Sequence, residues 1–414
     1  MQILKRDSGG IRLAIAASIA VLVALAGCTD PEDSGGESEP GDDVVVDDVE
    51  FDAASDVESD EGACEDGDGT FAVSDVQGEI EEGAEIVVCG DEFGDQGPET
   101  VFFDDFEDGE PGESLDEEGP VVGEWYTPGG PVVDDESRSG SNSLLLLDHE
   151  ESTQTSVFAI PDEEGRFGLR HFDEFFMHWS LKDLGDFPGN DSSPTDFSSD
   201  SSVKDIWVMF GDRGDNYDYS CSQGECNGND IVLASHTGGG GFKHDGNNTR
   251  SDWWISDFWQ FEAWNRMSFH LRLDDDDPYG DATGDFEHFS EEGGYFQDDY
   301  EGPMMREELD EIPPVWDRIK VGAWYRGAGE TRRIADDIYI AIGDGAAARV
   351  EVADAETIEE ATNIAVATVD DWSKERLEAT LRLGDLDPGD DDLHLFVVDA
   401  DNRRTPGFAL NQLN

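Results

Sequence analysis

Two short stretches frame the main domain: VFFDDFEDG at residues 101–109 and ADDIYIAIG at residues 335–343. Both place aromatic and β-branched residues next to Asp and Gly, which favours short strands that end in turns. The residues between them contain many short apolar runs and very little helical periodicity. Several runs alternate apolar with polar residues, which predicts strands with one face in a core and one in solvent. The runs are 144–147, 156–160, 175–181, 204–210, 231–235, 266–273 and 318–325.

The two framing stretches, together with the strand start SRSGSNSL at residues 137–144, resemble concanavalin A-like lectin and glucanase jelly rolls. Members of that family are two curved antiparallel sheets, with the first and last strands side by side and a concave face that binds or cleaves polysaccharide. The resemblance predicts an all-β fold with a two-sheet antiparallel jelly-roll domain at residues 99–344. We expect small flanking β-sandwich modules, an immunoglobulin-like one at residues 63–98 and a C-terminal one at residues 345–414.

The first 28 residues resemble a lipoprotein signal peptide. Basic residues precede an apolar run at 13–26 that is too short to span a bilayer comfortably, and LAGC at 25–28 resembles a lipobox. A lipid on Cys28 would anchor the protein to the extracellular face of the cell membrane. Residues 29–62 are acidic and nearly free of aromatic side chains, which predicts a disordered tether. A plain signal peptide, or a buried Cys28 in an N-terminal helix, is the alternative, and the export route stays open between Sec and twin-arginine.

The charge balance is strongly acidic along the whole chain. Lys and Arg total 25 and Asp and Glu total 101, which gives a net charge of −76 over 414 residues. This composition resembles haloarchaeal proteins, because molar salt shortens the Debye length to about 3 Å and screens neighbouring carboxylates. An acidic tail on an ordinary domain is the alternative. Nucleic acid and anionic membrane surfaces are electrostatically poor partners for such a chain.

Five cysteines remain to be assigned. With Cys28 reserved for lipid, the other four predict two disulfides, Cys64–Cys89 and Cys221–Cys226, because an exported protein lives where disulfides persist. Free thiols or a metal pair are the alternative.

The candidate carbohydrate-binding residues come from strand parity. In the strand at 175–181, Phe175, Met177 and Trp179 share one face that we expect in the core, which leaves His178 on the other face. Strand parity in the neighbouring runs places further aromatic and basic side chains on the same face and so predicts an aromatic-lined, basic groove. Such a groove suits an anionic polysaccharide, since indole rings stack on sugar rings and basic side chains attract its charge. Its predicted members are His178, Arg272, Trp324, Arg326 and Trp254. The alternative is that the tryptophans fill the core between the sheets.

Two kinds of catalysis follow from the resemblance. Glycosidases with this fold carry a Glu-x-Asp-x-x-Glu strand motif, which the candidate strands lack. Jelly-roll polysaccharide lyases use His, Tyr and Arg or Gln, and the matching residue types here are His270, Tyr325 and Arg266.

No cofactor is required by either reading, although oxygen ligands at the framing strands are a candidate for structural calcium. The residues are Asp105, Glu107 and Asp337, with a solvated acidic edge as the alternative. We therefore expect a cell-surface lipoprotein that binds extracellular polysaccharide and is not an enzyme. The first alternative is a lyase acting on a uronate-containing glycan, and the second is a non-catalytic structural envelope protein.

Overall fold

The structure is a computed structural model. It describes Cys64 and residues 69–112, 120–126, 132–133, 136–148, 157–158, 172–185, 202–210, 231–236, 241–245, 250–253, 260, 262–273, 282–290, 294–302, 316–326, 331–389 and 392–410. For residues 157–158, 202–253 and most of 316–326 the description concerns the backbone. None of the helices in these described ranges is long and apolar enough to cross a membrane.

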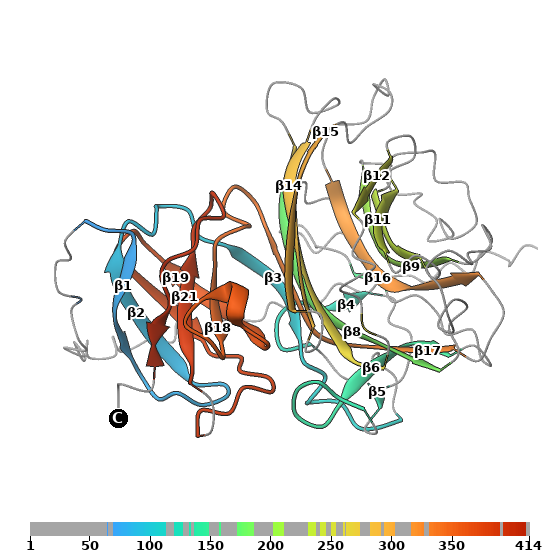
Figure 1. The fold of residues 1–414 in the computed structure, drawn as a ribbon, viewed down its shortest axis with the longest axis horizontal. Helices are drawn as coiled ribbons and strands as arrows, with labels where there is room; N and C mark the ends of the chain where they lie inside the picture. Colours follow the sequence, from blue (N-terminus) through green and yellow to red (C-terminus); the bar gives the residue numbers. More distant parts are fainter. Residues whose placement is uncertain are drawn as a thin grey trace, which may run out of the picture. The chain divides into compact units, whose positions relative to one another are not determined.

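The jelly-roll domain is built on two antiparallel sheets (Figure 1). The larger, eight-stranded sheet runs β15-β14-β13-β8-β17-β6-β5, with β3 also paired to β17. Its strands are β3 (Glu99–Asp104), β5 (Val132–Val133), β6 (Ser143–Asp148), β8 (Glu174–Gly185), β13 (Trp264–Leu273), β14 (Ala282–Ser290), β15 (Gly294–Gly302) and β17 (Thr331–Ile342). The pairing of β3 with β17 confirms that the two framing stretches lie side by side.

The second sheet of the domain has five strands in the order β12-β11-β10-β9-β16. They are β9 (Ser202–Phe210), β10 (Ile231–His236), β11 (Gly241–Asp245), β12 (Arg250–Trp253) and β16 (Trp316–Arg326). A further two-stranded sheet joins β4 (Trp125–Tyr126) to β7 (Val157–Phe158). The predicted all-β class with antiparallel sheets is confirmed.

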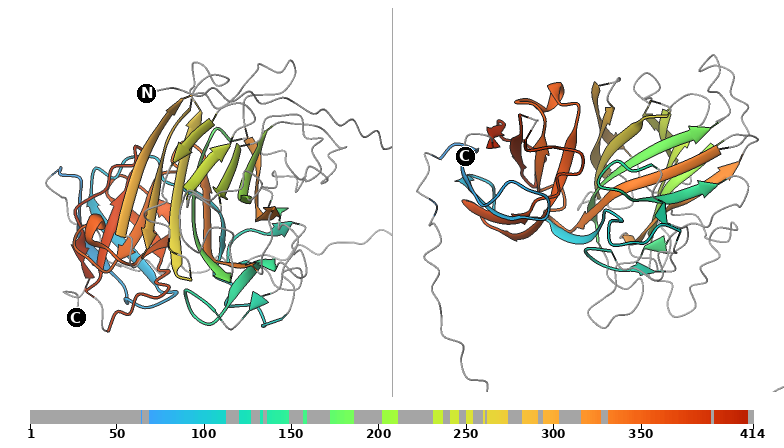
Figure 2. Two further views of the ribbon diagram at one scale, coloured as in Figure 1. Left: turned by 45° about the vertical axis from the view of Figure 1, so that its right-hand side comes forward. Right: turned by 90° about the horizontal axis from the view of Figure 1, so that it is seen from below.

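The flanking segments expected as two separate modules form one sheet instead. Its order is β1-β2-β20-β19-β18-β21-β22, so the two strands from before the jelly-roll domain join the five from after it through the pairing of β2 with β20. They are β1 (Ala72–Gln77), β2 (Glu85–Asp91), β18 (Arg349–Ala353), β19 (Ile364–Trp372), β20 (Arg376–Thr380), β21 (His394–Val398) and β22 (Phe408–Ala409), with a 3₁₀ turn at η3 (Ile358–Glu360). We call this unit the sandwich module. Figure 2 shows its blue and red strands side by side.

The sandwich module has its own apolar core. Val76, Ile86 and Val88 from the N-terminal segment pack with Leu377 and Leu395 from the C-terminal one. The predicted Cys64–Cys89 disulfide is present, with a Cα–Cα separation of 5.5 Å. Cys28, Cys221 and Cys226 lie outside the described residues. The jelly-roll domain is thus inserted between two segments that fold together.

Strand β8 of the eight-stranded sheet is buried on both faces. As predicted, Phe175, Met177 and Trp179 of β8 lie in a core, each at most 1% exposed. Phe176 points to the opposite face, where it packs with Tyr339 and Ala341 of β17 against Val366 of the sandwich module. The face that strand parity left for solvent is therefore covered by the second unit.

Candidate functional site

Three of the predicted groove and catalytic residues lie on this covered face. His178 is 2% exposed, Arg266 7% and His270 8%. His178 Nδ1 lies 2.9 Å from Ser268 Oγ, and Arg266 Nη1 donates to the Thr362 carbonyl of the sandwich module at 2.8 Å. The expected open groove of these side chains is therefore not formed. The physical reason is that parity separates the two faces of a strand but does not say which face a second unit covers.

His270 is held between two carboxylates. Its Nε2 lies 3.0 Å from Glu174 Oε1 and its Nδ1 lies 3.2 Å from Asp285 Oδ2. Burial lowers the pKa of His270, but the hydrogen bonds and charges of Asp285 and Glu174 outweigh it, so the net shift is upward. Both ring nitrogens of His270 are engaged by carboxylates, so neither is free to abstract a proton from a substrate, which argues against the role of catalytic base.

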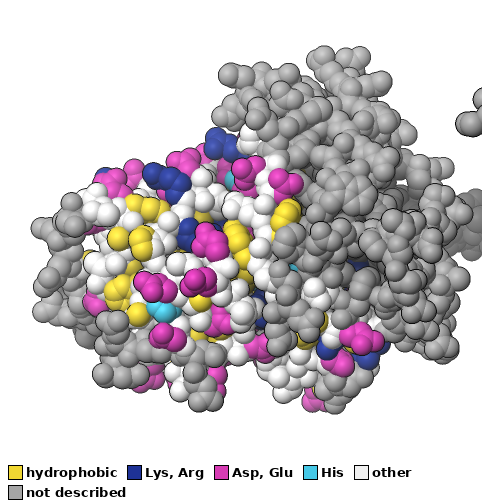
Figure 3. Space-filling view, in the orientation of Figure 1, with side chains coloured by type: hydrophobic (Ala, Val, Ile, Leu, Met, Phe, Trp, Pro, Cys, Tyr) yellow, Lys and Arg dark blue, Asp and Glu magenta, His cyan; other side chains and the backbone are white. Residues whose placement is uncertain are grey.

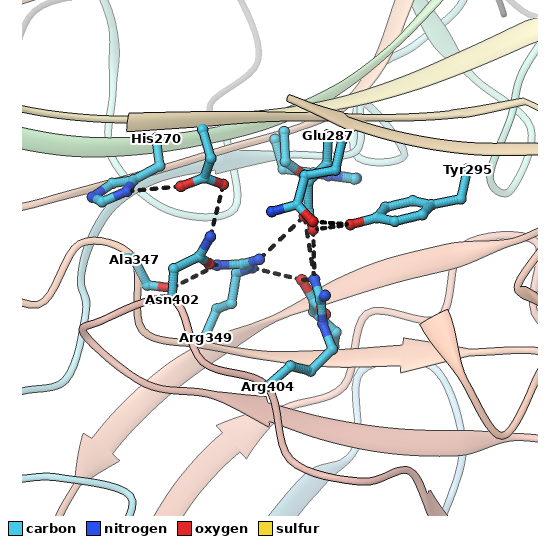
Figure 4. A network of polar contacts seen from close by, with 12 residues as sticks. His270, Glu287, Tyr295, Ala347, Arg349, Asn402 and Arg404 are labelled. Atoms are coloured by element: carbon cyan, nitrogen blue, oxygen red, sulfur yellow. Dashed lines mark hydrogen bonds and ion pairs between the residues drawn. The ribbon is translucent and has the colours of Figure 1, made fainter. Parts of the chain in front are cut away.

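A buried ion-pair network joins the two units beside His270 (Figure 4). Glu287 of β14 accepts hydrogen bonds from Arg349 Nη2 at 3.3 Å, Arg404 Nη2 at 3.0 Å and Tyr295 Oη at 2.8 Å. Arg349 and Arg404 also donate to Glu351 of β18, at 2.6 and 2.7 Å. In Figure 4, His270 and Glu287 descend from one layer of strands, and the two arginines rise from the other. This network was not predicted from the sequence, because its carboxylates and guanidiniums come from distant segments.

The network changes the acidity of its members. Burial raises the pKa of Glu351, but the charges of Arg349 and Arg404 outweigh burial and lower this pKa to about 2. Burial and the neighbouring Glu287 raise the pKa of Tyr295. The Arg349 guanidinium also lies 4.4 Å from the centre of the Phe176 ring. These contacts are those of a structural joint, with every charge matched by an opposite one.

The predicted calcium ligands are occupied by hydrogen-bond donors. Asp337 Oδ2 accepts from Arg138 Nη1 at 2.5 Å and its Oδ1 accepts from Ser139 Oγ at 2.8 Å. Glu107 Oε1 accepts from the backbone N–H groups of Ser141 and Asn142, and Asp105 Oδ1 from that of Glu107 at 3.2 Å. Within the described ranges, no group of three or more His, Cys, Asp and Glu side chains is arranged to hold a metal ion. Calcium here stays a prediction.

The remaining predicted residues are spread over other places. Arg272 is on the covered side of β13, but its side chain is 45% exposed and its Nε lies 3.6 Å from Glu174 Oε2. In β16, Trp324 pairs with Lys204, Tyr325 with Val203 and Arg326 with Ser202. Tyr325 is thus in the five-stranded sheet and His270 in the eight-stranded one, so the proposed lyase residues come from different sheets. Trp254 lies outside the described residues.

An open hollow of about 610 Å³ lies on the sandwich module, across strands β1, β2, β20 and β19. We call it the sandwich groove. Its volume is within the roughly 300–1,000 Å³ of small-molecule sites. The lining residues are Gln77, Gly78, Glu85, Ile86, Val87, Asp370, Arg376, Glu378 and Ala379. Strand pairing explains the set, because Gln77 is opposite Val87, and Val87 is opposite Glu378.

Polar contacts hold the groove side chains in place. Arg376 Nη2 pairs with Glu378 Oε1 at 2.5 Å, with side chains 35% and 46% exposed. Thr380 Oγ1 donates to Asp370 Oδ2 at 3.1 Å, and Gln77 Nε2 donates to Asp75 Oδ2 at 3.1 Å. The groove therefore offers a guanidinium donor and several oxygen acceptors above an aliphatic floor. Such a set can both donate to and accept from hydroxyl groups.

On the face shown in Figure 3, acidic side chains are spread over the described surface, and basic and apolar side chains form small separate patches. In the described part of the chain, Val121 is the one exposed large hydrophobic side chain. A broad apolar docking patch is therefore not part of the described surface.

Comparisons with known proteins give structural similarity without sequence similarity. No family model and no curated protein matches the chain. Among solved structures, the chain is similar to a PL-14 alginate lyase from Aplysia kurodai, with 10% identity over 52% of this chain and 87% of the lyase and a TM-score of 0.34. It is also similar to lectin II from Ulex europaeus, with 14% identity over 50% of this chain and 89% of the lectin and a TM-score of 0.28. A third match is domain 4 of an extracellular arabinanase from Geobacillus stearothermophilus in complex with arabinotriose, with 12% identity, coverage of 60% and 94%, and a TM-score of 0.24. All three scores are below 0.5, so the function below is inferred from the chain's own residues.

Proposed function

We propose that this protein binds extracellular polysaccharide without cleaving it. The observation that carries the proposal is the sandwich groove, an open polar hollow whose donors and acceptors are already oriented by contacts with each other. Sugar hydroxyls both donate and accept, so they match a guanidinium beside carboxylates and an amide. The groove crosses three strand spacings, about 14 Å, which accommodates a short stretch of a glycan chain.

Charge decides which glycan the groove takes. Its lining contains three carboxylates, Glu85, Asp370 and Glu378, and one guanidinium, Arg376. The net charge of the groove lining is 1 − 3 = −2, which disfavours a polyuronate and leaves a neutral polysaccharide as the ligand. The expectation of an anionic glycan rested on basic side chains that are buried between the two units, so it does not extend to this groove.

The absence of cleavage is inferred from the placement of the lyase residues. His270 and Arg266 are buried against the sandwich module, while Tyr325 is in the other sheet. A proton abstraction needs base, acid and charge neutraliser around one substrate carbon. We keep export, the lipid on Cys28 and the resulting position on the extracellular face of the membrane as parts of the proposal. Trp324 and Arg326 remain candidates for a second glycan contact on the jelly-roll domain.

The test is retention of the full chain on immobilised neutral polysaccharide in molar potassium chloride, with a polyuronate as the comparison. Glu378→Ala removes a charge-assisted partner of the sugar hydroxyls, which should weaken binding about tenfold. Glu359→Ala removes an equally acidic but exposed side chain on η3, outside the groove, and should bind like the parent. Equal retention of both variants would refute the groove as the binding site. A parallel loss in Trp324→Ala but not in Trp324→Phe would place the glycan on the jelly-roll domain instead.

A further inference from the structure

A guanidinium and a carboxylate lie side by side in the lining of the sandwich groove. Arg376 and Glu378 are two residues apart on β20, so they belong to the same face of the strand. Arg376 Nη2 pairs with Glu378 Oε1 at 2.5 Å, and the two side chains stay partly open to solvent, at 35% and 46% exposure. We call these two residues the groove pair. Their contact holds a donor next to an acceptor before a ligand arrives.

The groove pair keeps atoms that can bind a ligand. Within the described ranges, Arg376 Nε and Nη1 and Glu378 Oε2 have no hydrogen-bond or ion-pair partner. A guanidinium carries several N–H donors, and the contact with Glu378 involves only one of its nitrogens. The pair therefore offers N–H donors beside a carboxylate acceptor. Hydrogen bonds to such charged groups are about twice as strong as those between neutral groups.

The other polar side chains of the groove are acceptors or are already occupied. Glu85 and Asp370 are carboxylates, which have no donor to offer. Gln77 Nε2 donates to Asp75 Oδ2 at 3.1 Å and to Cys89 Sγ at 3.9 Å. Along the described lining, the groove pair is therefore the place where a ligand oxygen can accept a side-chain hydrogen bond.

The floor of the groove is aliphatic. Val87 is opposite Glu378 in the strand pairing, and Ile86 is opposite Ala379. No aromatic residue is among the described residues that line the groove. A sugar ring that depends on stacking its flat face on an indole or phenyl ring has no partner there. Recognition has to come from the hydroxyl groups at the edge of the ring.

We infer that the groove pair makes the sandwich groove specific for neutral glycans with free vicinal hydroxyl groups. One hydroxyl donates to Glu378 Oε2, and its neighbour on the ring accepts from Arg376 Nε or Nη1. Two gauche hydroxyls on adjacent carbons are about one hydrogen-bond length apart, as are the charged ends of the groove pair. An isolated hydroxyl engages only one of the two. The inference rests on the proposed function, to which it adds the hydroxyl pattern that the glycan must carry.

The test is retention of the full chain on immobilised neutral polysaccharides in molar potassium chloride, each before and after treatment with periodate and then borohydride. Periodate cleaves the carbon–carbon bond between vicinal hydroxyls and leaves isolated hydroxyls intact. The panel contains a β-(1→4)-mannan and an α-(1→6)-glucan, whose rings carry vicinal hydroxyls. It also contains a long β-(1→3)-glucan, whose internal rings carry none. The parent should be retained by at least one of the first two, lose this retention after periodate, and pass over the third.

Two variants assign the specificity to the groove pair. Arg376→Gln removes its charged donor and should weaken retention on the glycan with vicinal hydroxyls about tenfold. Arg403→Gln removes the same charge from a side chain that is 64% exposed and outside the groove, and it should bind like the parent.

Three outcomes would overturn the inference while glycan binding itself stands. They are retention on the β-(1→3)-glucan equal to that on the other two, retention unchanged by periodate, and equal retention of Arg376→Gln and Arg403→Gln. Retention on none of the polysaccharides would instead refute the proposed function and the inference with it.

Discussion

Replacing Glu287 by Gln tests the joint between the two units most sharply. Glu287 is 1% exposed and accepts hydrogen bonds from Arg349, Arg404 and Tyr295. The carboxylates of Glu287 and Glu351 match the two guanidiniums of the network, so its net charge is zero. The amide keeps the shape of the side chain but leaves one buried positive charge unmatched.

The expected loss follows from that unmatched charge. Removing one partner of a buried ion pair costs about 3–5 kcal/mol. Whole domains are stable by only about 5–15 kcal/mol, so the variant should lose a large share of its stability. A loss of about 3 kcal/mol lowers the ratio of folded to unfolded protein by about a hundredfold.

The assay is equilibrium unfolding in urea, followed by tryptophan fluorescence, in one and in three molar potassium chloride. Glu359→Gln removes the same charge from an exposed position on η3 and should change stability by less than about 0.5 kcal/mol. Because the Glu287 network is buried, the difference between the two variants should depend little on salt. Equal unfolding midpoints for Glu287→Gln and Glu359→Gln would refute the ion-pair joint, and a difference abolished by salt would show that the charges are exposed.

Three further predictions concern the same region and the disulfide. The pKa of His270 is raised in the folded state, so protonation of His270 stabilises the fold fully below the unfolded pKa of about 6.5, and this stabilisation is lost as pH rises through the folded pKa. The difference in melting temperature between the parent and His270→Ala should therefore shrink between pH 6 and pH 9. A difference that grows over this range would contradict the site between two carboxylates. Arg138→Ala removes the partner of buried Asp337 and should cost about 3–5 kcal/mol in urea unfolding, whereas a loss below 1 kcal/mol would mean that this contact is solvated. Replacing Cys64 and Cys89 by Ser should lower stability by about 3 kcal/mol on the loop-entropy model, and an unchanged midpoint would show that the closed loop contributes nothing.

Many strands of the jelly-roll domain could be predicted from alternation, but β14 and β15, of nine residues each, were missed, as were the shorter β11 and β12. β14 and β15 contain Gly284, Asp285, Glu287 and Asp298, residues that usually indicate a loop. Glu287 is compatible with a buried strand only because Arg349 and Arg404 meet it from the sandwich module. A single segment does not reveal a partner that lies far along the chain.

The candidate site could be predicted only in part for the same reason. Parity correctly separated Phe175, Met177 and Trp179 from His178, but it left the His178 face open to solvent. The cover comes from pairing β2 with β20, which merges the two flanking segments into one unit. That merger also creates the sandwich groove, since Gln77 and Glu378 belong to different segments.

Binding without cleavage is tested most directly by incubating the full chain with neutral and uronate-containing polysaccharides in molar salt and following retention together with new reducing and unsaturated chain ends. We predict retention of the neutral polysaccharide, weaker retention in Glu378→Ala, and no new ends. Unsaturated ends that appear with the parent and vanish in His270→Ala would contradict it, because a sealed imidazole between two carboxylates would then be acting as a base.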